Sequence, residues 1–499
     1  MTDTFVQTIT SLGFLDYSIL GLALLILFAI TYFKGKDEKD TKDFFLGRRK
    51  TPMWVACLSF VATEISAMTI VGVPAVGFKE NWQYLQFFIG SAAARLLIAY
   101  LFIPAFYKYN CTTIYEFLKH RFGSATQYSG SIFFFITRLL ASGVRLYAAS
   151  LAVSVIMGWD LKMTLLFFTV ISMAFIGFGG IKAVVWTGAF EAITFYIAGI
   201  GIAVYLILNI QGGFLEFLQV AGEAGKLSVF NFAWDVKDPN VLLIAVINGM
   251  VGSMAAFGTD QEMMQRLLTV DTRESSQKTL VATIFASFPL VLLYLAIGSL
   301  IFVFYQQNPS LPVPDNSDKI ISHFTFYILP AGLKGLILTA IILASIDSPL
   351  SSLSSSFVTD IYRPLLAKHR TEKHYLLISR VCVVTFALVL AGTAFLCQSV
   401  EGMLWLAFKI NGVTAGSLLG VFLLGLMTKR HANRANIFAM VFSAVSMGVL
   451  LYLSETGKIG LGWSWLIVIG TISTFVLGYL LGPIMDKNRV EGKGVRGEN

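Results

Sequence analysis

The sequence predicts an all-α integral membrane protein with about 13 transmembrane helices. Composition is the first observation: of 499 residues, 56% are hydrophobic and only 13% are charged. Soluble domains carry about 25% charged residues. The mean hydropathy of +0.73 is the second. The third is spacing, because apolar segments of about 20 residues, long enough to cross a bilayer, recur along the chain with no soluble domain between them.

The predicted spans follow one another at short intervals. The first, residues 14–33, is expected to stay uncleaved, because Asp3 replaces the basic start of a signal peptide and no small-residue cleavage site follows. The other spans are expected near residues 52–77, 83–107, 128–157, 162–178, 184–209, 241–263, 280–305, 332–358, 374–397, 402–427, 435–453 and 462–485.

Basic residues predict the orientation in the membrane. Placing the loop 34–51 in the cytoplasm puts most of the 37 Lys and Arg residues on that side. An odd number of spans then places the amino terminus outside and the basic carboxyl terminus in the cytoplasm, with the protein in the plasma (inner) membrane. The net charge of +8 therefore reflects orientation and not nucleic-acid binding. The four cysteines show no metal-type or redox-type spacing, so zinc sites and disulfides are not expected.

The span around residues 51–78 carries polar groups at membrane depth. Glu64 lies near its centre beside Thr63 and Ser66, and Gly72 and Pro74 follow. A carboxylate there costs at least about 2.5 kcal/mol on insertion scales, so Glu64 must face protein, water or a ligand. We predict a helix that opens at mid-membrane and exposes carbonyls to an ion or substrate. A kinked helix with Glu64 as a buried structural partner is the alternative.

A second interrupted span is predicted at residues 241–263, where Asn248 and several glycines break an apolar frame. It lies five spans after the first and crosses in the opposite direction. Paired interrupted spans in two halves of opposite topology indicate an inverted-repeat transporter with its site between the repeats.

Two arginines share a face of the span near 128–157. Arg138, Ser142, Arg145 and Ala149 follow helical spacing, so both guanidinium groups are expected to face the bundle interior, with Glu64 as counter-charge. Either arginine could hold an anionic substrate, since guanidinium binds carboxylate in a two-pronged manner. Snorkelling to the membrane interface is the alternative.

The span near 332–358 carries a dense group of oxygen atoms. Ser345, Asp347, Ser348, Ser351 and Ser352 fall in one short stretch. Hydroxyls, carbonyls and one carboxylate suit a hard cation such as Na⁺. Serines also allow close helix packing, but a buried carboxylate such as Asp347 needs a cation, a proton or an arginine.

Several ordered motifs resemble one known family over nearly the whole length. They are FFLGRRKTPMWVACLSFVATEISAMTIVGVP, GGIKAVVWTGAFEA at 179–192, GTDQEMMQRLLTVDTRESSQK at 258–278, the ASIDSPLSS stretch ending in TDIYRPL, and GSLLGVFLLGLMTKRHAN. In these the chain resembles the sodium/solute symporters, which couple solute uptake to the inward sodium gradient by alternating access.

The resemblance implies a leucine-transporter-type five-plus-five inverted repeat, with one helix before it and two after, and two helices broken at the midplane. Residues 1–499 would form a single polytopic transporter domain. Within it, residues 14–33 would be the extra first helix, 52–209 the first repeat, 241–427 the second repeat and 435–485 the two terminal helices.

The resemblance also implies a set of sodium ligands, with Na⁺ as the coupling ion. These are the carbonyls of Ala62, Ile65 and Ile341 and the hydroxyl of Ser345, with Asp347 and Ser348 as ligands of an additional sodium site. The chain departs from the family at two positions. Ala344 stands where a hydroxyl is usual, and Gly188 stands where relatives with the additional site have an aspartate.

The solute pocket implied by the resemblance lies beside the first break. Aromatic groups over a few directed polar groups are typical of a small-solute cavity. The candidates are Glu64, Ser66, Thr69, Trp82, Gln83, Gln86, Arg138, Arg145, Asn248 and Phe257.

The predicted function is sodium-coupled symport that imports a small polar or anionic organic solute. Proton-coupled or exchange transport remains open because of Glu64, Glu191 and Asp347, and a channel or a solute sensor fits less well. An enzyme is not expected, because no HExxH, GxSxG or paired Cys and His motif occurs. The expected partners are the solute, Na⁺ and the lipid bilayer, with no nucleic acid and no obligatory protein partner.

Overall fold

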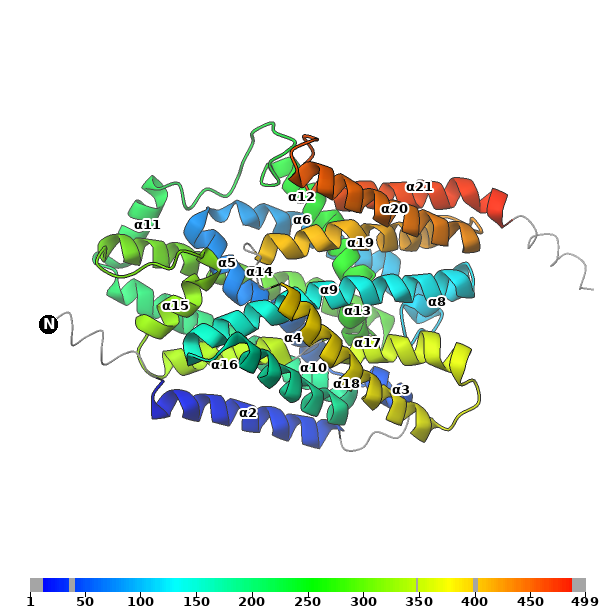
Figure 1. Cartoon of the computed structure of the whole chain (residues 1–499), viewed down its shortest axis with the longest axis horizontal. Coiled ribbons are helices and arrows are strands. Elements are labelled where there is room, and N and C mark those ends of the chain that lie inside the picture. Colours follow the sequence, from blue (N-terminus) through cyan, green and yellow to red (C-terminus); the bar gives the residue numbers. More distant parts are fainter. Residues whose placement is uncertain (1–11, 36–40, 347–348, 398–402, 487–499) are drawn as a thin grey trace, which may run out of the picture.

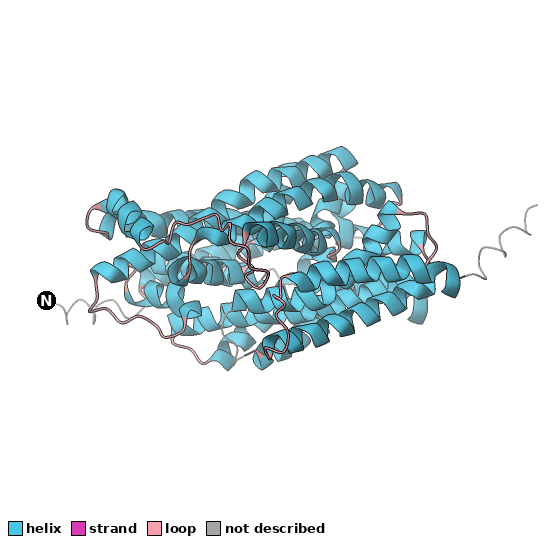
Figure 2. Ribbon diagram, turned by 90° about the horizontal axis from the view of Figure 1, so that it is seen from above, coloured by secondary structure: helices cyan, strands magenta, loops and turns pink. Residues whose placement is uncertain are grey.

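Long helices lie side by side along one direction, and the loops that join them gather at the two ends (Figures 1 and 2). The computed structural model describes residues 12–35, 41–346, 349–397 and 403–486. Every regular element in these ranges is a helix. The prediction of an all-α fold is confirmed.

Among the described residues, ten helical segments are long and apolar enough to cross a membrane. They are α2 (Phe14–Gly35), α6 (Leu85–Leu97) with α7 (Ile103–Lys108), α9 (Ser124–Met157), the second part of α10 (Leu161–Asn209), α14 (Arg273–Gln307), α16 (Leu333–Ile346) with α17 (Leu350–Ser356), α18 (Glu372–Leu396), α19 (Met403–Met427), α20 (Asn433–Glu455) and α21 (Trp465–Met485).

Shorter helices lie at the ends of the bundle. Figure 1 shows α11 (Gly213–Glu223) and α15 (Ile320–Tyr327) at one end and α3 (Thr41–Leu46) and α8 (Tyr115–Arg121) toward the other. Helix α2 begins at the end that holds α11 and α15, whereas α21 finishes at the opposite end. The first described helix therefore starts at one end of the bundle, and the last described helix finishes at the other.

The described part of the chain thus holds ten candidate spans, or up to twelve if each of two bent helix pairs counts as one crossing. The predicted thirteen is thus not confirmed. The predicted count differs from the upper count because of the two spans predicted at 162–178 and 184–209, which both lie in helix α10 (Leu161–Asn209). Helix α10 is interrupted between them at Gly180, with φ 47°, but the apolar part before the interruption, Leu161–Ala174, is short.

The first bent pair is α4 (Met53–Glu64) and α5 (Ala67–Lys79), which meet at 58°. Ile65, with φ −86° and ψ 67°, and Ser66, with extended backbone, separate them. The break falls within the predicted polar stretch, directly after Glu64. Around such a break some carbonyls lack the next helical turn's N–H and can face a ligand.

The second bent pair is α12 (Leu242–Ser253), continued by a π-helical turn to Gly258, and α13 (Gln261–Leu268), at 64°. The predicted break is confirmed, but it falls at Thr259 and Asp260, past the glycine-rich stretch. Asp260 determines the position of the break, because it is the N-cap of α13: its Oδ1 accepts a hydrogen bond from the N–H of Glu262 (2.8 Å).

Each bent pair packs very closely against one straight helix. A Cβ atom on Gly77 in α5 would lie 2.2 Å from the carbonyl oxygen of Leu295 on α14. A Cβ atom on Gly249 in α12 would lie 2.2 Å from the carbonyl oxygen of Phe87 on α6. Glycine lets these backbones touch, which is how small residues hold membrane bundles together.

Candidate functional site

A cavity of about 200 Å³, called here the central cavity, opens beside the break between α4 and α5. Its walls come from α6, α9, α12, α19 and α21 as well as from the break itself. Tyr84, Phe87, Phe88, Phe408 and Trp463 supply aromatic surface. A mostly apolar cavity with a few directed polar groups is suited to a small organic solute.

Seven of the ten predicted solute residues line the central cavity. They are Glu64, Ser66, Thr69, Arg138, Arg145, Asn248 and Phe257.

Trp82, Gln83 and Gln86 line neither this cavity nor the smaller one described below. The Trp82 indole donates a hydrogen bond to the Ser299 hydroxyl (2.9 Å), and the Gln86 amide donates to the carbonyl of Asn240 (2.7 Å). Gln86 thus holds the connection before α12, and Trp82 is held by α14; a role of Trp82, Gln83 and Gln86 in binding the solute stays a prediction.

Glu64 contacts neither predicted arginine in its described interactions. It forms a salt bridge with Arg95 of α6 and accepts a hydrogen bond from Ser287 of α14. The Arg95 side chain is fully buried, and its guanidinium lies 5.2 Å from the Phe88 ring and 5.0 Å from the Phe257 ring. The predicted pairing with Arg138 or Arg145 is therefore wrong. Arg95 could have been found, since it is a charge inside the predicted span 83–107.

Arg138 belongs to a buried charge network at the start of α13. It forms salt bridges with Asp260 (3.2 Å) and Glu262, and Glu262 also faces Arg266 (3.9 Å). Arg266 in turn donates a hydrogen bond to the Ser59 hydroxyl (3.1 Å). The network joins α9, α13 and α4 at the edge of the central cavity. The three charges on α13 were not among the predicted site residues, although they lie within the quoted motif at 258–278.

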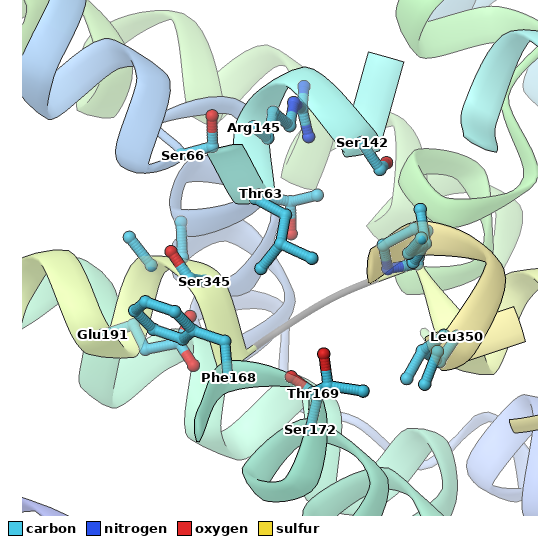
Figure 3. A pocket seen from close by; sticks show the side chains of 16 residues that line it. Thr63, Ser66, Ser142, Arg145, Phe168, Thr169, Ser172, Glu191, Ser345 and Leu350 are labelled. Atoms are coloured by element: carbon cyan, nitrogen blue, oxygen red, sulfur yellow. The ribbon is translucent and has the colours of Figure 1, made fainter. Parts of the chain in front are cut away.

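A smaller cavity of about 40 Å³, called here the side cavity, adjoins the other face of the first break (Figure 3). Ala62, Thr63 and Ser66 line it from the break, and Ala344 and Ser345 line it from α16. Its remaining lining comes from α9, α10, α17 and α18: Ser142, Arg145, Leu146, Phe168, Thr169, Ser172, Glu191, Pro349, Leu350, Ala387 and Leu390.

Two of the predicted sodium ligands line this cavity; of two others, one lies at the same helix break and one accepts a hydrogen bond from Ser345. Ala62 and Ser345 line it, and the Ser345 hydroxyl donates to the carbonyl of Ile341 (3.1 Å). Ile65 lines the central cavity at the same break. Asp347 and Ser348 lie outside the described residues. Carbonyls at a helix break facing a hydroxyl form a suitable set of ligands for Na⁺.

Comparison with known proteins supports the same interpretation. The model of the sodium:solute symporter family matches residues 44–443. The chain is 28% identical over 487 residues to the sodium/sialic acid symporter NanT of Aliivibrio fischeri, covering 96% of this chain and 95% of that protein. It is 25% identical over 455 residues to the human sodium/iodide cotransporter, covering 89% and 70%.

A solved structure has the same fold. It is a Na⁺-coupled sialic acid symporter in a substrate-bound, outward-open state, reported with a novel Na⁺ site. The TM-score is 0.86 at 26% identity, covering 95% of this chain and 98% of that one. The nucleobase-cation symporter Mhp1, at 13% identity and TM-score 0.57, is similar in fold alone.

Proposed function

Because the chain belongs to the sodium:solute symporter family, we propose that it imports a small polar or anionic organic solute together with Na⁺ by alternating access. Sodium-coupled symport is the activity of its relatives, which are transporters and not enzymes. The helices and the family make it a multi-pass membrane protein. We further propose that its amino terminus lies outside the cell and its carboxyl terminus in the cytoplasm.

The proposed repeats follow the two bent pairs. Residues 52–209 begin with α4 and α5, and residues 241–427 begin with α12 and α13, which supports an inverted pair of five-helix units. Residues 14–33 and 435–485 would be helices outside the repeats, within one transporter domain of residues 1–499.

The position of Arg145 carries the proposal of an acidic solute. Arg145 lines both the central and the side cavity, next to Ser66 of the helix break. Arg138, which also lines the central cavity, forms salt bridges with Asp260 and Glu262. A carboxylated solute in the central cavity would contact Arg145 of α9 while Na⁺ is held at the break between α4 and α5. Binding of the solute and binding of Na⁺ would then favour the same position of α9 relative to the broken helix. The sialic acid symporters among the relatives suggest an acidic sugar.

The direct test is uptake by the purified protein in liposomes. Uptake of radioactive sialic acid, with a neutral N-acetyl sugar as control, is expected to require an inward Na⁺ gradient. A thermal-shift screen of carboxylated solutes with and without Na⁺ identifies the substrate if sialic acid is not transported. Uptake driven by a pH gradient in sodium-free vesicles would contradict sodium coupling and favour the proton-coupled alternative.

Ser345→Ala is expected to raise the apparent Na⁺ requirement severalfold, because it removes one of few oxygen ligands. The measurement is the Na⁺ dependence of solute uptake. Ser129→Ala is a matched control: Ser129 also donates to the carbonyl four residues earlier (3.0 Å), but it lies outside both cavities. Unchanged Na⁺ dependence in Ser345→Ala would remove Ser345 from the site.

Arg145→Gln is expected to weaken binding of the acidic solute about 10- to 100-fold, because a charge-assisted hydrogen bond contributes about 1.5–3 kcal/mol. The apparent KM for the carboxylated solute should rise, and Arg145→Lys should recover part of the loss by keeping the charge. An unchanged KM in Arg145→Gln would show that the carboxylate binds elsewhere.

A further inference from the structure

Helix α2, which lies outside the proposed repeats, is fastened to the start of α16 by a buried carboxylate. Asp16 of α2 is only 1% exposed. Its Oδ1 accepts hydrogen bonds from the N–H groups of Gly332 (2.7 Å) and Gly335 (2.8 Å), and its Oδ2 accepts one from Gly13 (2.8 Å). The first N–H groups of a helix have no partner within it, and the helix dipole also favours a carboxylate there. Asp16 therefore caps α16 from a different helix.

The backbones of α2 and α16 touch at this point. A Cβ atom on Gly335 would lie 2.5 Å from the Cα and 2.7 Å from the carbonyl oxygen of Asp16. Gly332, with φ 91°, has a backbone conformation that favours glycine, and a Cβ atom there would lie 3.1 Å from the Leu15 side chain. The contact thus depends on the glycines at the start of α16 as well as on Asp16.

Along the rest of its length α2 lies beside α16 and α10 at one edge of the bundle (Figure 1). Its other buried residues form an almost wholly apolar stripe: Leu20, Ala23, Leu27, Thr31 and Gly35. Apolar contacts between membrane helices have little direction because lipid is equally apolar, whereas hydrogen bonds fix one helix against another. Asp16 therefore determines the position of α2 along α16.

The other end of α16 carries predicted sodium ligands. Ser345 follows Gly335 by ten residues, which is about 15 Å along a helix, and it lines the side cavity with its hydroxyl donating to the Ile341 carbonyl. Residues 337–343 between the two ends are each at most 1% exposed, so neighbouring helices enclose them. A packed interior is hardly compressible, so a shift at the start of α16 is carried to Ser345. Ligands of a functional site must be held to within about 0.5 Å.

We propose that Asp16 is a positioning residue for sodium binding. By docking α2 on the start of α16, it sets the position of Ser345 and of the Ile341 carbonyl relative to the break between α4 and α5. Asp16 itself lines neither cavity, so it acts through α16 and not as a ligand. The proposal rests on the sodium coupling of the proposed function, and it gives the helix before the repeats a part in that coupling.

The test measures binding of radioactive sodium to the purified full-length protein without solute, by scintillation proximity. Asp16→Ala is expected to weaken sodium binding severalfold, because the start of α16 loses its acceptor. The apparent KM for the solute at saturating Na⁺ should stay unchanged. Asp16→Asn should recover part of the sodium affinity, because its amide oxygen can still accept from Gly332 and Gly335, whereas its amide nitrogen cannot accept from Gly13.

A matched control separates positioning from stability. Asp486, at the end of α21, caps α20 in the same manner, since its carboxylate accepts hydrogen bonds from the N–H groups of Arg434 (3.1 Å) and Ala435 (3.3 Å). No described residue of α20 lines either cavity. Asp486→Ala should therefore lower the unfolding midpoint and leave sodium affinity unchanged.

A second pair of variants tests the same contact from the side of α16. Gly335→Ala should weaken sodium binding, because its Cβ would push α2 and α16 apart at Asp16. Gly21→Ala on α2 is the control: a Cβ atom there would meet nothing within 4 Å, so sodium binding should not change.

Several results would overturn the role of Asp16 and leave sodium coupling intact. One is wild-type sodium affinity in folded Asp16→Ala, which would leave Asp16 as a structural contact alone. Another is an equal loss of sodium affinity in Asp486→Ala, because any destabilised bundle would then bind sodium weakly. If Asp16→Ala does not fold, Asp16→Asn and Gly335→Ala decide, and unchanged sodium binding in both contradicts the proposal. Absence of any sodium binding by the wild type would instead refute the proposed function.

Discussion

Glu64→Gln is expected to lower the free energy of unfolding by about 3–5 kcal/mol, the usual cost of breaking one side of a buried ion pair. The Arg95 side chain is fully buried and only 13% of the Glu64 side chain is exposed, so the remaining guanidinium could not move into water. The thermal unfolding midpoint of the purified protein measures the loss.

A double-mutant comparison identifies the partner. Arg95→Met should be nearly as damaging alone, but Glu64→Gln combined with Arg95→Met should be less destabilised than the sum of the two changes. In contrast, the double variant Glu64→Gln, Arg145→Met should be destabilised by about the sum of the two single changes. A normal midpoint in Glu64→Gln would show that the pair contributes nothing to stability. Normal stability with selective loss of solute binding would instead place Glu64 in the solute site.

Gly249→Ala is expected to destabilise the protein at the upper end of the about 1–3 kcal/mol typical of overpacking. The added Cβ would lie 2.2 Å from the carbonyl oxygen of Phe87, a backbone atom that cannot rotate away, so α6 and α12 must separate. The reciprocal change Gly90→Ala should have a similar effect, because its Cβ would lie 2.0 Å from the carbonyl oxygen of Val246. Folded yield and unfolding midpoint are the measurements.

Gly252→Ala provides the matched control on the same helix. A Cβ atom at Gly252 would meet nothing within 4 Å. The unfolding midpoint of the Gly252→Ala variant should therefore be unchanged or slightly higher than that of the wild type, because alanine favours the helix more than glycine does. Equal losses for Gly249→Ala and Gly252→Ala would mean that helix flexibility, and not the close approach of α6, requires glycine here.

Much of this architecture could be predicted from the sequence because it depends on local chemistry. Apolar length determines which segments can cross a membrane, and the predicted spans overlap the observed helices from α2 to α21. Polar groups around Glu64, together with helix-weakening residues, indicated the break now seen at Ile65 and Ser66. Local chemistry does not predict that Ala62 and Ser345 meet at the side cavity, and only the resemblance to a family indicated it.

By itself, then, the sequence determined the class of fold and the existence of two broken helices, and with the resemblance to a family it indicated seven of the residues around the central cavity. Only the tertiary structure decided that Glu64 pairs with Arg95, that Arg138 pairs with Asp260 and Glu262, and that Glu191 shares a cavity with Ser345. The reason is physical. Hydropathy and backbone hydrogen bonds act within one segment, whereas the partner of a buried charge depends on which helix faces meet, and glycines such as Gly249 set how closely they meet.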